Sequence, residues 1–574
     1  MRADALSTPQ TSLAAHCSSI RVVLARLEGE CVAQLPESRA ADLERLRNEE
    51  FDVVVIGGGI TGAGALLEAV TRGYRAALVE AGDFASRTSS ASSKLIHGGL
   101  RYLAQREIRL VYENLAERSI LMRAAPSLVS PLDFVIPLPR RNGALDFSYA
   151  ATYSMVLWGY DLTGGFRIHR RHRRIGSADA KSMLPTLDAS KVASAFVYPD
   201  AWCDDVRLVL AVIAAARRAG GVAVNYLPAA ELHNDGRGAV RAVAVKGAYP
   251  GDDAATAQGF EIRTRAIINA TGTAAATFLD GASLAIRPAK GVHIAFPQTA
   301  LPAKTAAVLP VPGDSRTIFV LPWNDYTYVG TTDTDLGDEQ VATTEADISY
   351  LLEAASASLV EPLRREQVSG AWVGVRPLVA DIDPSKPVPE RTKDLSRRHR
   401  VITSDQGVIS VIGGKLTTFR KMGKDAIDAL DKLAGRKTAS VSARLKLDVN
   451  PGARPANRQE AALFLRYGSA AASAREFLEM AGPENVSGNW RISAGEIDYL
   501  VAREDALTVS DVLLRRLRVG ILDAAAAVDL APLVATRLSE RLGMSGAESE
   551  ESITRFRADL ERELPGSSSL RAGH

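Results

Sequence analysis

The segment from Phe51 to Glu80, FDVVVIGGGITGAGALLEAVTRGYRAALVE, constrains the fold of this chain more than any other part of it. Apolar residues 53–56 predict a buried parallel strand, and the apolar pattern of residues 63–70 predicts a helix. Residues 76–79 predict a second strand, which ends in the acid Glu80. Strand, glycine turn, helix, strand and acid in this order predict a βαβ unit that binds a dinucleotide.

Three glycines between the first strand and the helix have G-x-G-x-x-G spacing. Gly57 permits the tight turn, Gly59 lets the backbone approach a pyrophosphate, and Gly62 lets helix and strand pack closely. The N–H groups at the start of the helix then face the phosphates. Glu80 follows Gly62 by 18 residues and can bind both ribose hydroxyls. A purely structural βαβ unit is the alternative, and the complete order of parts argues against it.

Length and composition exclude several classes of protein. A chain of 574 residues is too long for one ordinary core and predicts two or three domains. Its net charge of +2 gives no general attraction to nucleic acid, so we expect no nucleic-acid partner. Three cysteines without a C-x-x-C pair or a Cys/His cluster predict neither a disulfide scaffold nor a metal site. Since no run of about 20 residues is purely apolar, we expect no transmembrane helix.

A second informative segment, TSSASSKLIHGGLRYL, spans residues 88–103. It follows Glu80 by a short turn, which places it near the dinucleotide. Three of its hydroxyl side chains can contact the diphosphate or the ring, namely Thr88, Ser89 and Ser93. Around a flexible Gly-Gly pair it then delivers three further side chains, His97, Arg101 and Tyr102.

Two later segments also combine a predicted buried strand with a turn rich in glycine or other small residues. Residues 266–272, AIINATG, predict a buried strand that brings a second backbone loop to the cofactor, although a plain strand end also fits these residues. Residues 408–433 predict a strand, a Gly-Gly turn and a helix whose N-terminus can hold another part of the cofactor.

Residues 286–334 alternate between apolar and polar side chains, as the strands of an antiparallel sheet do. We expect an irregular segment over residues 126–175 and a helix over residues 201–219.

The segment from Tyr153 to Arg174 leads from aromatic and apolar residues directly into a cluster of arginines and histidines. Aromatic side chains beside basic ones are typical of a surface that binds an anionic membrane. A buried cap helix followed by a solvent-exposed run of charged residues is equally consistent with this sequence. The sequence leaves both interpretations open.

Four basic side chains stand beside small-residue turns in otherwise apolar segments, where solvation explains them poorly: Arg101, His293, Arg376 and Lys415. Arginines that converge on one pocket suit a dianionic phosphate. The residues by themselves therefore predict a flavin or nicotinamide enzyme that acts on a small anionic molecule.

A series of motifs closely resembles the FAD-dependent, aerobic and quinone-linked glycerol-3-phosphate dehydrogenase family. In chain order they are VIGGGITGAG, TSSASSKLIHGGLRYL, DDVRLVL, INATG, KGVHI, GTTDTD, GVRPL and GGKLTTFRKM. The resemblance covers roughly residues 50–520 and implies an α/β fold. This fold combines a Rossmann-like FAD-binding domain of the D-amino-acid-oxidase type with an antiparallel-sheet substrate domain and a C-terminal helical domain.

The resemblance also implies how these domains divide the chain. The FAD-binding domain comprises residues 49–125, 200–285 and 371–440, and the substrate or cap domain comprises residues 126–199 and 286–370. An N-terminal extension, residues 1–48, includes an expected amphipathic helix at Ile20 to Leu27, and residues 450–574 form the helical domain.

Residue roles carry over from the family motif by motif. The implied FAD-binding residues are Gly57, Gly59, Gly62, Glu80, Thr88, Ser89, Ser93, Ala270, Gly272, Gly414, Leu416 and Thr417. The implied phosphate pocket consists of Arg101, Tyr102, Arg376 and Arg397. The implied catalytic residues are His293, Arg376 and Lys415.

The implied reaction is oxidation of sn-glycerol 3-phosphate to dihydroxyacetone phosphate by hydride transfer to FAD. His293 is the candidate base because imidazole titrates near neutral pH, with His97 as competitor and a structural histidine as the alternative. Lys290 competes with Lys415 as the catalytic lysine.

Membrane quinone is the implied electron acceptor. The resemblance also implies a homodimer in the cytoplasm that is attached peripherally to the inner face of the cell membrane. A soluble oxidase that uses O2 and a non-catalytic dinucleotide-binding module are the alternatives.

Overall fold

The structure is a computed structural model. The residues it describes are 39–104, 107–141, 144–165, 170–236, 238–279, 284–314, 316–337, 340–381, 398–447, 463–464, 466–481, 490 and 492–570. The expected helix at Ile20 to Leu27 and the phosphate-pocket candidate Arg397 lie outside these residues, and the side chain of Arg101 is not described.

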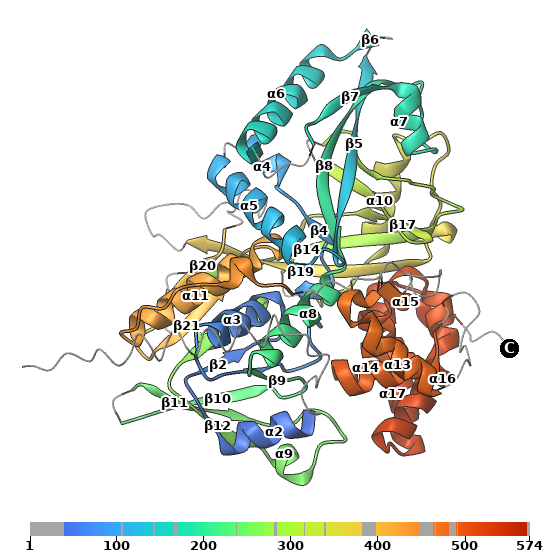
Figure 1. The fold of residues 1–574 in the computed structure, drawn as a ribbon. Helices are drawn as coiled ribbons and strands as arrows, with labels where there is room; N and C mark the ends of the chain where they lie inside the picture. The colour runs from blue at the N-terminus through green and yellow to red at the C-terminus, as the bar shows by residue number, and fades with distance from the viewer. Residues whose placement is uncertain are drawn as a thin grey trace, which may run out of the picture.

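A six-stranded sheet forms the centre of the lower left lobe in Figure 1. Its strands, in spatial order, are β20 (Arg400–Thr403), β21 (Val408–Ile412), β13 (Ile267–Asn269), β2 (Val53–Ile56), β3 (Ala76–Val79) and β9 (Val222–Val224). All neighbours are parallel except β20 and β21. The helices that pack with this sheet are α3 (Ile60–Thr71), α8 (Asp205–Arg218) and α11 (Phe419–Leu433). The predicted βαβ unit is therefore confirmed, with both strands at the predicted residues.

A smaller four-stranded sheet lies beside it. Its strands are β1 (Glu50–Phe51), β12 (Phe260–Thr264), β11 (Val240–Val245) and β10 (Ala229–Asn234), and the short helices near it are α2 (Arg39–Asn48) and α9 (Ala254–Gln258). This sheet lies on the side of the lobe away from the substrate domain in Figure 1.

An eleven-stranded sheet forms the substrate domain. Its main path is β18 (Thr334–Asp335), β14 (Leu284–Pro297), β17 (Tyr326–Gly330), β16 (Thr317–Trp323), β15 (Ala306–Pro310), β5 (Val129–Arg141), β8 (Val192–Cys203) and β4 (Leu95–Ile96). Three strands pair beside this path, namely β19 (Gly370–Asp381), β6 (Ala144–Leu145) and β7 (Arg173–Gly176). The predicted antiparallel sheet is confirmed with one exception, because β15 and β5 pair in parallel.

Two sequence predictions are wrong in part, one in this domain and one at helix α8. The described part of residues 126–175 is regular, since it contains the long strand β5 and the helix α6 (Phe147–Gly164). The helix predicted over residues 201–219 begins at Asp205, because Ala201 to Cys203 pair with β4 and β5 as the end of β8. The other helices of this domain are α4 (Leu100–Ala104), α5 (Ile108–Ala124), α7 (Ser177–Met183) and α10 (Glu345–Ser356).

The predicted helical domain follows at the C-terminal end and lies at the lower right in Figure 1. Its helices are α13 (Ala471–Ala481), α14 (Ala494–Glu504), a π-helical turn η9 (Asp511–Arg516), α15 (Val519–Leu522), α16 (Ala524–Leu542) and α17 (Gly546–Glu563). Its apolar side chains share one continuous core with the eleven-stranded sheet. The two domains therefore support each other.

Candidate active site

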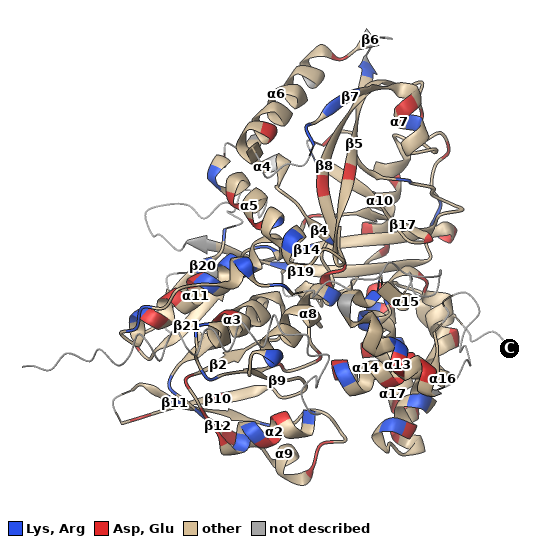
Figure 2. Cartoon of the chain, in the orientation of Figure 1, with Lys and Arg blue, Asp and Glu red and all other residues tan. Residues whose placement is uncertain are grey.

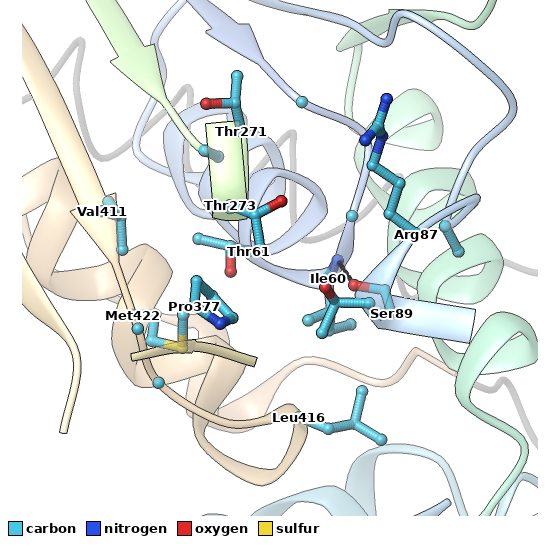
Figure 3. Close-up of a pocket in the computed structure, with 18 of the residues that line it drawn as sticks. Ile60, Thr61, Arg87, Ser89, Thr271, Thr273, Pro377, Val411, Leu416 and Met422 are labelled. Atoms are coloured by element: carbon cyan, nitrogen blue, oxygen red, sulfur yellow. Dashed lines mark hydrogen bonds between the residues drawn. The ribbon is translucent and has the colours of Figure 1, made fainter. Parts of the chain in front are cut away.

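A cavity of about 160 Å³ lies at the carboxyl ends of four parallel strands. Ligands of open α/β sheets bind at this edge. The residues that follow these strands line the cavity: Gly57 after β2, Glu80 after β3, Ala270 after β13 and Gly413 after β21. Figure 3 shows its interior, where Ile60 at the start of α3 donates its N–H to Ser89 Oγ over 2.9 Å.

The glycines around this cavity are required by contacts across it. A Cβ atom on Gly57 would lie 2.5 Å from the carbonyl oxygen of Ala270, and one on Gly62 would lie 1.8 Å from the carbonyl oxygen of Gly57. Gly57 also has a φ of +111°. Gly59 permits Ser89 to approach the backbone, since its Cβ would lie 2.9 Å from Ser89 Oγ. These approaches bring the backbone of the turn and the start of α3 to the cavity wall, where a pyrophosphate would bind.

Glu80 lines the same cavity and is fixed by the backbone. Its two carboxylate oxygens accept N–H bonds from Gly58 at 2.6 Å and Gly82 at 2.9 Å. Burial raises the pKa of Glu80 above its ordinary value, and the two N–H groups oppose this rise. Each oxygen keeps a lone pair for a ribose hydroxyl, so the residues present fit the adenosine end of FAD.

A second cavity, of about 200 Å³, shares a wall with the first. The shared lining residues are Thr88, Ser92, Pro377, Gly413, Gly414, Lys415 and Leu416. Of the residues predicted from the sequence, those that line the second cavity but not the first are Ser93, His97, Tyr102, His293, Arg376 and Thr417. A molecule in the second cavity therefore lies directly against the end of a dinucleotide bound in the first.

His293 stands in the wall of the second cavity on the central strand β14. Gly330 on the neighbouring strand makes room for it, because a Cβ there would lie 2.1 Å from the imidazole. His293 Nε2 forms a hydrogen bond of 2.9 Å with Ser93 Oγ, and the ring stacks on Trp372 at 4.8 Å between centroids. Burial lowers the pKa of His293 well below its ordinary value, and the charges of Lys94 and Arg376 lower it further. The imidazole is therefore neutral at physiological pH.

Two cations line the second cavity. Arg376 on β19 donates to Asp333 Oδ1 at 3.1 Å and to Thr331 Oγ1 at 3.2 Å, and about a quarter of its side chain is exposed. The ammonium of Lys415 lies 3.6 Å from the centroid of the Tyr102 ring. Such a contact stabilises a cation in a partly desolvated position.

The structure places the competing candidates differently. Lys290 does not line either cavity, because its ammonium is buried 2.7 Å from Asp347 Oδ2 at the start of α10. His97 does line the second cavity, and its backbone N–H donates to Thr417 Oγ1 at 3.2 Å. Arg101 lies in α4 next to Tyr102.

The first cavity contains residues that the sequence interpretation missed. They are Ile60, Thr61, Ala85, Ser86, Arg87, Ser92, Thr271, Thr273, Pro377, Val411, Gly413 and Met422. Arg87 and Pro377 lie on opposite sides of the view in Figure 3. Arg87 had a local signal, since it directly precedes residues 88–103, which we call the serine-rich segment. Pro377 stands in the GVRPL motif directly after Arg376, but nothing in the sequence indicated that strand β19 brings it to this cavity.

The part of the chain that the structure describes also bears on membrane spans and metal sites. None of the helices there is long and apolar enough to cross a membrane. No three side chains among His, Cys, Asp and Glu in the same part of the chain come together as ligands for a metal ion.

The comparisons with known proteins agree with this geometry. Residues 52–420 match the family model described as FAD dependent oxidoreductase, and residues 432–549 match the C-terminal domain of alpha-glycerophosphate oxidase. Glycerol-3-phosphate dehydrogenase 2 of Mycobacterium tuberculosis is 34% identical over 561 residues, which cover 92% of this chain and 91% of the relative. The human mitochondrial glycerol-3-phosphate dehydrogenase is 34% identical over 578 residues, which cover 93% of this chain and 76% of the relative.

A solved structure has the same fold. The glycerol-3-phosphate dehydrogenase from Bacillus halodurans, complexed with FAD, superposes with a TM-score of 0.72 over 92% of this chain and 97% of that one, at 24% identity. The comparisons confirm the fold, the FAD cofactor and the oxidoreductase class that the motifs implied.

Proposed function

Because the chain belongs to the FAD-dependent glycerol-3-phosphate dehydrogenase family, we propose that it oxidises the C2 hydroxyl of sn-glycerol 3-phosphate to give dihydroxyacetone phosphate. FAD supplies the hydride acceptor for this reaction. The observation that carries the proposal is the shared wall of the two cavities: Lys415 lines both, and Arg376 and a neutral His293 line the second cavity beside it.

The phosphate of the substrate binds to the cationic side of the second cavity. Arg376 has Asp333 and Thr331 behind it, which fix the plane of its guanidinium for a bidentate contact. Tyr102 lines the same cavity. Arg101 and Arg397 stay phosphate-pocket candidates from the sequence motifs alone. Holding the phosphate at this end orients C2 toward the shared wall.

His293 acts as the base that takes the hydroxyl proton of C2. Its neutral form is the one a base needs, and its bond to Ser93 Oγ fixes the ring. Lys415 lies in the shared wall and stabilises the negative charge that develops on the substrate oxygen.

A comparison of sn-glycerol 3-phosphate with glycerol tests this assignment. We expect kcat/KM for glycerol to be lower by about 1,000-fold, because two or more charged hydrogen bonds to the phosphate, each worth about 1.5–3 kcal/mol, are lost. Steady-state reduction of a soluble quinone analogue measures both values. Equal values for the two alcohols would remove the phosphate pocket from the proposal.

Helix α6 supports membrane quinone as the electron acceptor. Four large apolar side chains on it are half to four-fifths exposed, namely Phe147, Met155, Trp158 and Leu162. Their spacing places them on one face of the helix. Figure 2 shows α6 almost free of charge, next to the basic strand β7. Arg170, Arg171, Arg173 and Arg174 nearby are exposed. An apolar face with arginines beside it suits an anionic lipid surface.

The other side of α6 is buried, which agrees in part with the interpretation of this segment as a buried cap helix. Leu157 and Tyr160 are fully buried, and Asp161 pairs with His172 at 2.8 Å. The helix therefore packs on the cap with one face and presents the other. We propose that this second face attaches the enzyme peripherally to the inner face of the membrane.

Replacing Met155 and Leu162 together with serine is expected to lower retention on phosphatidylglycerol vesicles at least about tenfold. Each exposed apolar side chain contributes about 1.5 kcal/mol or more when it enters the interface. Co-sedimentation of the FAD-loaded enzyme measures the retention. The matched control replaces Met480 and Val360, which are 74% and 59% exposed elsewhere on the surface, with serine. Equal losses in both variants would contradict this docking face.

The oxidase alternative has a direct readout. A quinone-linked enzyme reduces a quinone analogue much faster than it consumes O2, whereas an oxidase of the same family releases one peroxide per substrate. Measuring both rates on the same preparation decides between them. The proposed homodimer is checked on that preparation by its mass in solution.

A further inference from the structure

Three charged side chains from distant parts of the chain meet in the interior next to the second cavity. Lys94 comes from the serine-rich segment, Asp205 begins α8, and Arg518 comes from the C-terminal helical domain. All three are at most 3% exposed. Lys94 Nζ lies 3.1 and 3.0 Å from the two oxygens of Asp205, and Arg518 donates to the same carboxylate. We call this group the buried triad.

The buried triad holds residues 90–92 of the serine-rich segment at several points. Asp205 Oδ2 accepts from the backbone N–H of Ser92 at 3.0 Å and from its hydroxyl at 2.7 Å. The carbonyl oxygen of Ser90 accepts from Lys94 Nζ at 3.1 Å and from Arg518 Nη2 at 2.9 Å. The helical domain therefore fixes the backbone of this segment through one arginine.

The held segment is in direct contact with the candidate base. Ser93, the next residue, bonds to His293 Nε2, and its carbonyl oxygen accepts from the Tyr328 hydroxyl at 3.0 Å. Trp372, which stacks on His293, donates its Nε1–H to the carbonyl oxygen of Ser92 at 3.1 Å. The ammonium of Lys94 lies 4.7 Å from the centroid of the same Trp372 ring.

We propose that Lys94 and Arg518, joined by Asp205, are positioning residues for the oxidation step. They hold Ser93 against His293, and they place a fixed positive charge near the imidazole. This inference rests on the proposed function and assigns part of the active-site support to the C-terminal helical domain. Because a buried charge that loses its partner is strongly destabilising, the triad favours one arrangement of the serine-rich segment.

The charge of Lys94 has a separate effect from its geometry. Burial lowers the pKa of Lys94 to about 8, so its ammonium is charged throughout the acid range in which imidazole titrates. Besides Lys94, the polar and charged groups around His293 are Ser93 and His97 from the serine-rich segment, Tyr328 from β17, Arg376 from β19, and Tyr102, Lys415 and Thr417 in the same cavity wall. Burial, Lys94 and Arg376 together lower the pKa of His293.

The geometric part is tested with Arg518→Met. We expect a loss of about 10- to 100-fold in the limiting rate of flavin reduction, with KM for sn-glycerol 3-phosphate changed less than about threefold, because the base is displaced while the phosphate pocket remains. Arg518→Lys keeps the charge and should recover most of the rate. The control is Arg537→Met, which breaks a bidentate pair with Asp498 inside the helical domain. A loss in Arg537→Met equal to that in Arg518→Met, or a normal rate in Arg518→Met, would overturn the geometric part.

The charge is tested with Lys94→Met, followed through the pH profile of flavin reduction. Without this ammonium the pKa of His293 rises, so the acid limb should move upward by roughly one pH unit. The phosphate of the substrate titrates equally in both enzymes and cancels in the comparison. An acid limb at the same pH in both enzymes would overturn the role of the charge. If Arg518→Met does not fold, the pH profile of Lys94→Met still tests the proposal.

Failure of the proposed function gives a different result. In that case sn-glycerol 3-phosphate does not reduce the flavin of the unaltered enzyme at all. Failure of the present inference leaves the unaltered enzyme active and the variants indistinguishable from it.

Discussion

Replacing His293 with alanine is expected to lower the rate of flavin reduction by sn-glycerol 3-phosphate by about 100-fold or more. The substitution removes the neutral imidazole that faces the substrate cavity and leaves Ser93 without its partner. Arg376 and Lys415 remain, so the substrate should still bind. Stopped-flow measurement of flavin absorbance under anaerobic conditions gives the limiting rate and the apparent substrate affinity separately.

His97→Ala is the matched control, because His97 lines the same cavity. We expect its effect on the limiting rate to be much smaller, because the assignment of the base to His293 leaves His97 no role in removing the hydroxyl proton. If His97→Ala lost the rate and His293→Ala kept it, the base would have to be reassigned.

Replacing Gly62 with alanine is expected to abolish FAD binding. The new Cβ would lie 1.8 Å from the carbonyl oxygen of Gly57, a separation at which the turn has to move. Gly57 has little room to give way, because it lies against Ala270 on the neighbouring loop. The purified variant should be colourless, whereas the native protein should show the flavin absorbance of one FAD per chain.

Gly546→Ala provides the comparison for this variant. Gly546 is the first residue of α17, and a Cβ there would meet no atom within 4 Å. This protein should be as yellow as the native one. A Gly62→Ala protein with a full complement of FAD would show that the turn adapts and that the close approach is not needed.

The sequence predicted both strands of the dinucleotide unit to the residue, and its helix to within about three residues at either end, because its signals are local. Glycine spacing, the apolar runs at 53–56 and 76–79, and the terminal Glu80 all act within 30 residues. Strand β5 was missed because three of its residues, Pro131, Pro137 and Pro139, lack an N–H and argue against a strand. All three have the same parity, so the missing donors lie along one edge of the strand and the donors of the other edge remain intact.

The contacts within the site depend on long-range pairing that a sequence does not encode in its spacing. Thr88, Ser89 and Ser93 read as one group, yet Ser89 bonds to the start of α3 and Ser93 bonds to His293 on β14. The sequence does not distinguish Lys290 from Lys415 as the catalytic lysine, because it does not show that Lys290 pairs with Asp347 on α10. Arg518 carried no signal, because a charged residue in a helical segment ordinarily faces solvent.

An anaerobic titration of the purified enzyme with sn-glycerol 3-phosphate tests the central claim most directly. The account predicts that the yellow absorbance bleaches as substrate is added, and that dihydroxyacetone phosphate appears in an amount equal to the bound flavin. A protein that keeps its colour in an excess of this substrate would contradict the account.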